Sequence, residues 1–211
     1  FRFESRIPRV LTVGVCQKLK SYVDNLEVDD FLYIEIMIRN KDQNDNIGKN
    51  NRIIKSYKVD ILTDLNRLEE DIKKLCKAFN ARAYVYLSPR NNEKVFSEML
   101  LLMANYNKMK NYDSINRVFD KALKSIKGSM KHFIIDIDTK DLHYITNVRE
   151  EIINSAKLDS IEEPLIDIFE TNNGYHIITK PFNYYKTFKD KFPDIEIHKN
   201  NPTLLYYDDK V

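Results

Sequence analysis

The sequence contains few of the residues on which disulfide-rich and nucleotide-loop proteins depend. Its 211 residues include two cysteines, four glycines, six prolines and no tryptophan. Cys16 and Cys76 are far apart in apolar surroundings, so we expect reduced, buried thiols in a cytoplasmic protein rather than a disulfide or a metal pair. Neither a P-loop nor a dinucleotide-binding fingerprint is present among so few glycines.

Long apolar runs and an excess of one charge are missing as well. No run of about 18 apolar residues occurs, so we expect no membrane span. Because 34 Lys and Arg nearly balance 32 Asp and Glu, the net charge is +2. This excludes a polybasic binder whose affinity comes from overall charge. With 43% hydrophobic residues, the chain can bury a core as a single compact domain.

Hydrophobic periodicity predicts an α/β (α+β) fold. Alternation predicts strands at 31–40, 52–61, 81–89, 132–138, 164–171, 174–182, 194–198 and 203–207, with a hairpin loop at 41–51. Helical spacing predicts helices at about 63–79, 92–108, 112–126, 141–157 and 184–191. Ser88-Pro89 should end a strand, and Asn172-Asn173-Gly174 should close a hairpin. We therefore expect a mixed, largely antiparallel twisted sheet with flanking helices.

The segment FIIDIDTKD at 133–141 is the sharpest chemical feature. Strand alternation places Asp136 and Asp138 on one face, about 7 Å apart. Two such carboxylates repel each other unless a cation lies between them, and Mg²⁺ or Mn²⁺ prefers hard oxygen ligands together with substrate phosphates. The motif therefore suits metal-assisted phosphoryl or nucleotidyl transfer. The alternative is two ordinary polar residues at a strand end, one of them capping the next helix.

A second motif, TNNGYHIITKPF at 171–182, places a histidine directly after a tight turn. Gly174 leaves the backbone open to close approach. Lys180 lies on the same strand face as His176. An imidazole and an ammonium group on one face suit contact with nucleotide phosphates. A purely structural histidine is the alternative.

Together the two motifs resemble those of the archaeo-eukaryotic primase (primase-polymerase) superfamily, over about residues 130–200. That family pairs an apolar strand ending in D-x-D or D-x-E with a later strand that carries small-x-His. A third strand places an acidic residue after an apolar one. Here Asp136 and Asp138 match the first element, and Gly174-Tyr175-His176 matches the second. The candidates for the third acid are Asp194 first, Glu196 as its alternative, and Asp208 and Asp209 as weaker choices.

The resemblance implies a small, divergent, phage-like nucleotidyltransferase of DNA replication, with an RRM-like sheet of primase type. About 1–128 would form an N-terminal α/β module and about 129–211 the RRM-like module, within one catalytic domain. Asp136, Asp138 and the third acid would hold two Mg²⁺ or Mn²⁺ ions. His176 would contact the nucleotide's phosphates, assisted by Lys180. The zinc-binding element of many primases is not expected, because the chain has no Cys/His cluster.

Basic residues of the N-terminal module would contact a single-stranded template. They are Arg39, Lys41, Arg52, Lys55, Arg82 and Arg90. Tyr84 and Tyr86 could stack on its bases. A solvated basic face with core aromatics is the alternative. Of the other histidines, His198 could be a second phosphate contact, although a structural or surface role is simpler, while nothing fixes His132 and His143 on the D-x-D face.

Two other functions use the same residues. A metal-dependent nuclease or phosphoesterase would direct water at a phosphodiester, whereas a non-catalytic RRM-like nucleic-acid-binding replication protein would lack a ligand. The abundance of Lys, Asn, Ile and Tyr indicates an AT-rich genome, which suits a phage or mobile element acting in the host cytoplasm. The expected partners are nucleotides, single-stranded nucleic acid and replication proteins such as a helicase. A His176 more than about 12 Å from the aspartates would argue against the primase-type function.

Overall fold

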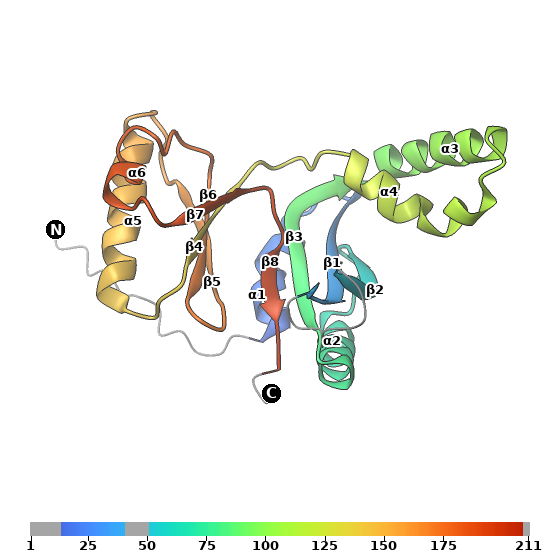
Figure 1. Ribbon diagram of the computed structural model, residues 1–211, viewed down its shortest axis with the longest axis horizontal. Coiled ribbons are helices and arrows are strands. Elements are labelled where there is room, and N and C mark those ends of the chain that lie inside the picture. The colour runs from blue at the N-terminus through green and yellow to red at the C-terminus, as the bar shows by residue number, and fades with distance from the viewer. Residues whose placement is uncertain (1–13, 41–50, 209–211) are drawn as a thin grey trace.

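The structure, a computed structural model, describes residues 14–40 and 51–208. Within these ranges the chain forms two four-stranded antiparallel sheets and six α-helices (Figure 1). The expected α+β class with antiparallel pairing and flanking helices is confirmed. The single sheet is wrong, because periodicity identifies strands but not their partners. The expected loop at 41–51 lies outside the described residues except for Asn51.

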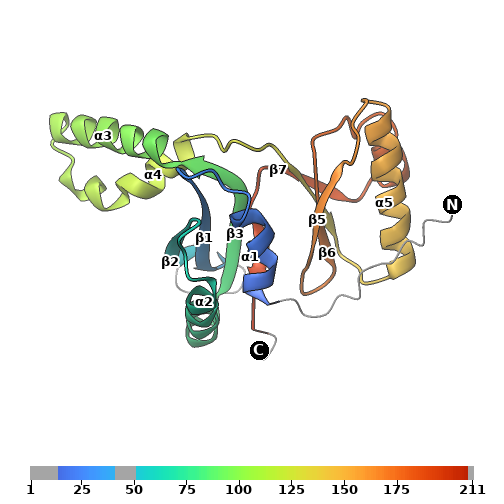
Figure 2. The same ribbon diagram turned by 180° about the vertical axis from the view of Figure 1, so that it is seen from behind.

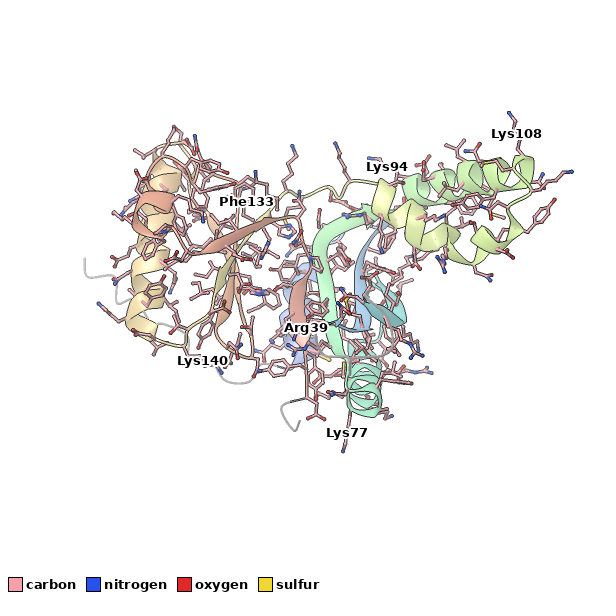
Figure 3. All side chains as sticks on the ribbon, viewed as in Figure 1. Arg39, Lys77, Lys94, Lys108, Phe133 and Lys140 are labelled. Carbon is pink, nitrogen blue, oxygen red and sulfur yellow. The ribbon has the colours of Figure 1, made fainter. Side chains whose placement is uncertain are left out.

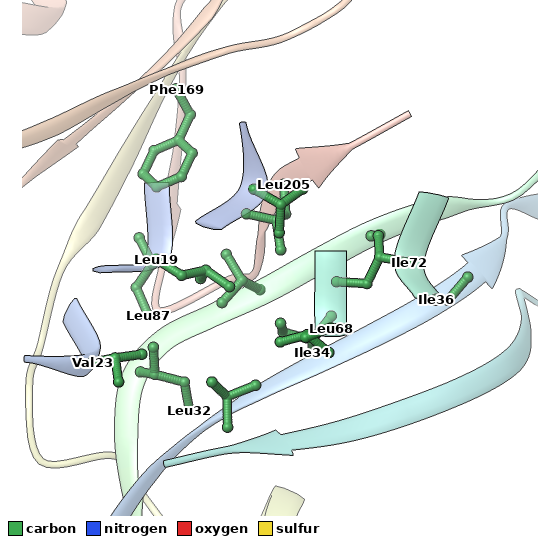
Figure 4. Packing of buried hydrophobic residues seen from close by; sticks show 14 of the residues in the cluster. Leu19, Val23, Leu32, Ile34, Ile36, Leu68, Ile72, Leu87, Phe169 and Leu205 are labelled. Atoms are coloured by element: carbon green, nitrogen blue, oxygen red, sulfur yellow. The ribbon is translucent and has the colours of Figure 1, made fainter. Parts of the chain in front are cut away.

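The first sheet has the strand order β2-β1-β3-β8. Its strands are β2 (Arg52–Val59), β1 (Asp30–Ile38), β3 (Arg82–Asn91) and β8 (Thr203–Tyr206). Alternation buries Leu32, Ile34 and Ile36 of β1 in a core shared with α1 (Val15–Val23) and α2 (Leu65–Phe79) (Figure 4). The other face of β1 carries Tyr33, Glu35 and Met37, so this face is more polar.

The second sheet has the order β5-β6-β4-β7. Its strands are β5 (Leu165–Glu170), β6 (Tyr175–Thr179), β4 (Phe133–Ile137) and β7 (Glu196–Lys199). Ile135, Ile137 and Ile177 pack in one core with Val148 and Ile152 of α5 (Leu142–Lys157) and with Phe188 of α6 (Phe188–Lys191). The opposite face of β4 presents Ile134 and Asp136 toward the first sheet.

The last strand joins the two sheets. After β7 the chain leaves the second sheet, and β8 pairs with β3 of the first, with Val85 opposite Thr203. Helix α1 lies between the sheets (Figure 2), where the Tyr22 hydroxyl donates to Asp167 of β5 at 3.1 Å. The strand expected at 203–207 is thus confirmed, and it belongs to the first sheet.

An arm of helices extends from the first sheet (Figure 1). It consists of α3 (Asn92–Lys108), the 3₁₀ helix η2 (Tyr112–Arg117) and α4 (Val118–Ser125). The single helix expected at 112–126 is therefore wrong, since its first half is a 3₁₀ helix. The stop expected at Ser88-Pro89 is also wrong. β3 continues to Asn91 because a bulge opposite Phe31 and Tyr33 accommodates the proline, which has no N–H to donate.

Helix α1 was not expected from the sequence, because it is capped from another helix. No side chain of its own caps its N-terminus. Instead, the Cys16 N–H donates to Glu69 of α2 at 2.8 Å. Burial alone would raise the pKa of Glu69, but hydrogen bonds from Cys16 and Lys73 lower this pKa to about 2. Within the described residues, none of the helices combines the length and apolar character needed to cross a membrane.

The hairpin predicted at Asn172-Asn173-Gly174 is confirmed, and Gly174 has a packing reason. The Thr171 N–H donates to the Gly174 carbonyl at 2.9 Å, which closes the turn between β5 and β6. A Cβ atom on Gly174 would come well within 3.0 Å of the Ile137 carbonyl oxygen, closer than real Cβ atoms approach. Only glycine therefore lets the turn pack against the end of β4, beside the D-x-D motif.

Gly174→Ala is expected to lower the free energy of unfolding by at least about 2 kcal/mol, because the added methyl must displace backbone. Urea denaturation measures the loss. Asn173→Ala is the matched control in the same turn. Its exposed side chain can be removed at a cost within about 0.5 kcal/mol. Equal stability of the two variants would contradict this account of the turn.

Candidate functional site

A cavity of about 730 Å³ lies between the two sheets, within the size range of ligand-binding pockets. The second sheet contributes what we call the acid–histidine wall: Asp136, Asp138, His176, Glu196 and His198. The first sheet and α4 contribute the basic–tyrosine wall: Glu35, Arg39, Arg82, Tyr84, Tyr86 and Lys124. The cavity thus places an acidic surface opposite a predominantly basic one.

Strand register builds the acid–histidine wall. β4 lies between β6 and β7, and Asp136 is opposite both His176 and Glu196. Cross-strand partners on one sheet face have neighbouring side chains. His176 Nε2 is 3.4 Å from Asp136 Oδ1, so the His176 position is compatible with the primase-type arrangement. Asp138 lines the same cavity, as the alternation predicts.

A side-chain hydrogen bond holds His176 from the other sheet. Its Nδ1 lies 2.7 Å from Oγ1 of Thr203, a fully buried residue of β8. One ring nitrogen therefore meets the first sheet while the other faces Asp136. This double attachment fixes the orientation of the imidazole at the cavity wall.

His198 extends the wall along β7. Its Nε2 is 3.4 Å from Glu196 Oε2 and 3.9 Å from Asp136 Oδ2. It is half-buried and faces the cavity, one residue beyond Ile197. The sequence offered two interpretations of His198, a second phosphate contact and the simpler structural or surface role. The structure places it in direct contact range of two carboxylates.

Of the candidates for the third acid, the structure brings Glu196 to the site. Asp194 precedes the start of β7, is exposed and does not line the cavity. Glu196 is the first residue of the strand and lies directly opposite Asp136. Asp208 does not line the cavity either, and Asp209 lies outside the described residues.

Lys180 is not brought to the cavity. β6 ends at Thr179, and the Lys180 amino group donates to the Glu162 carbonyl at 3.1 Å. Helix capping does not explain the D-x-D motif, because the carboxylate that caps α5 is that of Asp141, which accepts from the His143 N–H at 2.9 Å. His132 is buried outside the cavity lining, and burial lowers its pKa.

Two of the six expected template-binding residues line the cavity, namely Arg39 and Arg82. Figure 3 shows Arg39 over the first sheet beside β8, whereas Lys77 and Lys108 extend outward from helices. Arg52, Lys55 and Arg90 do not line it. Arg90 donates to the carbonyls of Ser88 and Leu123, and burial lowers its pKa. Lys41 lies outside the described residues.

The two tyrosines expected to stack on bases, Tyr84 and Tyr86, both line the cavity. The Tyr86 hydroxyl donates to Glu35 Oε2 at 3.0 Å, and burial together with the Glu35 charge raises the Tyr86 pKa. The site interpretation from the sequence missed Glu35 and Lys124. A signal existed for Glu35, since it is the one acidic residue inside the apolar run FLYIEIMI and alternates with Tyr33 and Met37.

The donor types of the acid–histidine wall suit a divalent cation. Carboxylate oxygens are the ligands of Mg²⁺ and Mn²⁺, and imidazole nitrogens also suit Mn²⁺-type transition metals. As the side chains lie, however, the described residues contain no group of three or more His, Cys, Asp or Glu already arranged to hold a metal ion. The donor types of the wall therefore fit a metal ion, while its side chains are not arranged around one in this structure.

No family model, curated protein or solved structure matches the chain. The likeness to primases therefore depends on the two short motifs and on the geometry of the residues that carry them.

The Thr203–His176 bond predicts a difference between two buried threonines. Thr203→Val removes the hydroxyl that meets His176 and should lower the free energy of unfolding by about 1 kcal/mol. Thr179→Val is the matched control, because the fully buried Thr179 hydroxyl has no hydrogen-bond partner in the described part of the chain. Its removal should therefore cost nothing or stabilise the fold. Urea denaturation of both variants tests this. A Thr203→Val variant as stable as Thr179→Val would contradict the role of the bond.

Proposed function

We propose that the protein is a metal-dependent nucleotidyltransferase of primase-polymerase type. The observation that carries the proposal is that Asp136, Asp138 and His176 line one cavity, with His176 Nε2 3.4 Å from Asp136. Glu196 supplies the third carboxylate from the neighbouring strand. This is the donor set that the D-x-D and G-x-H motifs imply for the family.

Each wall has a role in this proposal. Asp136, Asp138 and Glu196 would hold Mg²⁺ or Mn²⁺. The metal would activate the attacking hydroxyl and neutralise the charge of the triphosphate. His176, fixed by Thr203, would contact the phosphates. On the opposite wall, Arg39 and Arg82 would attract the phosphates of nucleotide or template. Tyr84 would offer a ring face to a base.

The proposed substrates are nucleotides and a single-stranded nucleic acid template. The proposed setting is the replication of a phage or mobile element in the host cytoplasm, together with proteins such as a helicase. The segregation of charge supports this choice. Acidic groups on one wall suit cations, and basic groups on the other suit phosphates, so both parts of a metal–nucleotide complex meet complementary charge.

A metal-dependent nuclease or phosphoesterase is the second candidate, and His198 favours it. Its imidazole lies 3.4 Å from Glu196 and 3.9 Å from Asp136, which is closer to the carboxylates than a phosphate contact alone requires. Beside a metal-binding carboxylate, such a group could accept a proton from an attacking water. The two functions differ in whether nucleotide is incorporated or phosphodiester is cleaved.

Template-directed incorporation of labelled nucleotide in the presence of Mg²⁺ or Mn²⁺ tests the proposal. Asp136→Asn and Glu196→Gln should each reduce incorporation at least about 100-fold, because each removes a negative oxygen ligand where charge develops. Asp194→Asn is the matched control and should retain the parent rate, since Asp194 lies outside the cavity lining.

Other outcomes identify other functions. Metal-dependent cleavage without added nucleotide, lost in Asp136→Asn, would identify a nuclease. Binding of single strands that survives Asp136→Asn, with neither incorporation nor cleavage by the parent, would identify a non-catalytic nucleic-acid-binding protein. Loss of incorporation in Asp194→Asn but not in Glu196→Gln would overturn the assignment of the third acid.

A further inference from the structure

Glu35 is a buried carboxylate that lines the cavity and has one oxygen without a hydrogen bond among the described residues. It lies in the middle of β1, is 2% exposed and lines the basic–tyrosine wall. Its Oε2 accepts the Tyr86 hydroxyl at 3.0 Å. Its Oε1 is buried and has no hydrogen-bond partner among the residues that the structure describes. Buried polar atoms in native proteins are nearly always paired, so an exception beside a cavity needs an explanation.

Charge balance does not supply that explanation. The Lys124 amino group lies 3.9 Å from Glu35 Oε1, which offsets the charge but is too far for a hydrogen bond. The other buried glutamate, Glu151, shows the contrast. At 4% exposed, it accepts hydrogen bonds from Ser155 on one oxygen and Lys191 on the other. An oxygen without a hydrogen bond is therefore not a general feature of the buried glutamates, and it distinguishes Glu35 at the cavity wall.

Neighbouring residues fix Glu35 Oε1 in an orientation in which it can accept a hydrogen bond from a ligand. The Tyr86 hydroxyl fixes one side of the carboxylate, so the other oxygen keeps its orientation. Tyr84 is opposite Glu35 on the neighbouring strand, and both side chains line the cavity. An acceptor beside a tyrosine ring can bind a group that has a hydroxyl or N–H donor next to an apolar face.

The proposed function decides which donor of a nucleotide this is, and the inference depends on that function. A template-directed site accepts all four bases, whose hydrogen-bonding edges pair with the template. The hydroxyl groups of the sugar are the donors that every incoming nucleotide shares. We propose that Glu35 Oε1 accepts a hydrogen bond from a ribose hydroxyl of the bound nucleotide, and that the cavity thereby recognises the sugar.

Equilibrium binding of ATP, 2′-deoxy-ATP and 3′-deoxy-ATP to the full chain, measured calorimetrically with Mn²⁺, tests the proposal. The parent should bind ATP about ten-fold or more tightly than at least one deoxy analogue, because a buried acceptor loses its only donor. The analogue that binds weakly identifies the hydroxyl. Glu35→Gln should reduce the difference, since a hydroxyl paired with a neutral amide makes a weaker hydrogen bond than one that donates to a carboxylate.

Glu151→Gln is the matched control, and it should retain the parent's preference because Glu151 is a buried carboxylate with its hydrogen bonds made elsewhere. If Glu35→Gln does not fold, Tyr86→Phe serves as a second variant. This variant removes the hydroxyl that fixes the orientation of the Glu35 carboxylate. It should therefore reduce the difference in affinity between ATP and the deoxy analogues.

Three results would overturn the proposal. Equal affinity of the parent for ATP and both deoxy analogues would refute sugar recognition while leaving the proposed function standing. A preference among ATP, GTP, CTP and UTP that Glu35→Gln removes would show that Glu35 reads a base. A parent that binds none of these nucleotides would refute the proposed function, and sugar recognition with it.

Discussion

The contact between His176 and Thr203 joins the two sheets at the point where the cavity forms. The imidazole Nδ1 and the threonine Oγ1 are 2.7 Å apart, and the two residues belong to different sheets. Because β8 pairs with β3, the segment between β7 and β8 must cross from one sheet to the other. The same crossing brings Asn201, Pro202 and Leu204 into the cavity lining. The position of the acid–histidine wall relative to the basic–tyrosine wall therefore depends on this strand.

Under the proposed function, the segregation of charge between the two walls would let a nearly neutral chain bind a charged ligand. The formal charge is only +2, yet acidic and basic groups are segregated onto facing walls. Asp136 and Glu196 on adjacent strands place negative charge on one wall, which favours the binding of a cation. Arg39 and Arg82 place positive charge on the opposite wall, which favours the binding of an anion. A metal–nucleotide complex satisfies both, which neither a bare cation nor a bare phosphate does.

Much of this site could be predicted from local pattern. Period-two alternation placed Asp136 and Asp138 on one strand face, and the turn at Gly174 placed His176 on the next strand. What the sequence could not give was pairing between distant strands. Asp194 and Glu196 are two residues apart, and only the start of β7 separates the one outside the cavity lining from the one that faces Asp136. The placement of Lys180 beside His176 failed for a similar reason, since β6 ends at Thr179, one residue before Lys180. Glu35 comes to the site because its sheet faces the other, a relation that no local pattern encodes.

If both walls form one nucleotide site, a bound metal ion and a bound nucleotide should affect residues on both sheets. Paramagnetic broadening of backbone amide resonances by Mn²⁺, with and without a nonhydrolysable nucleoside triphosphate, tests it most directly. We expect Mn²⁺ to broaden the amide resonances of Asp136, His176 and Glu196 at the lowest concentrations. Adding the nucleotide should then shift the amide resonances of Glu35 and Tyr84 on the opposite sheet. Uniform weak broadening over the surface carboxylates, with no response of Glu35 and Tyr84 to the nucleotide, would contradict it.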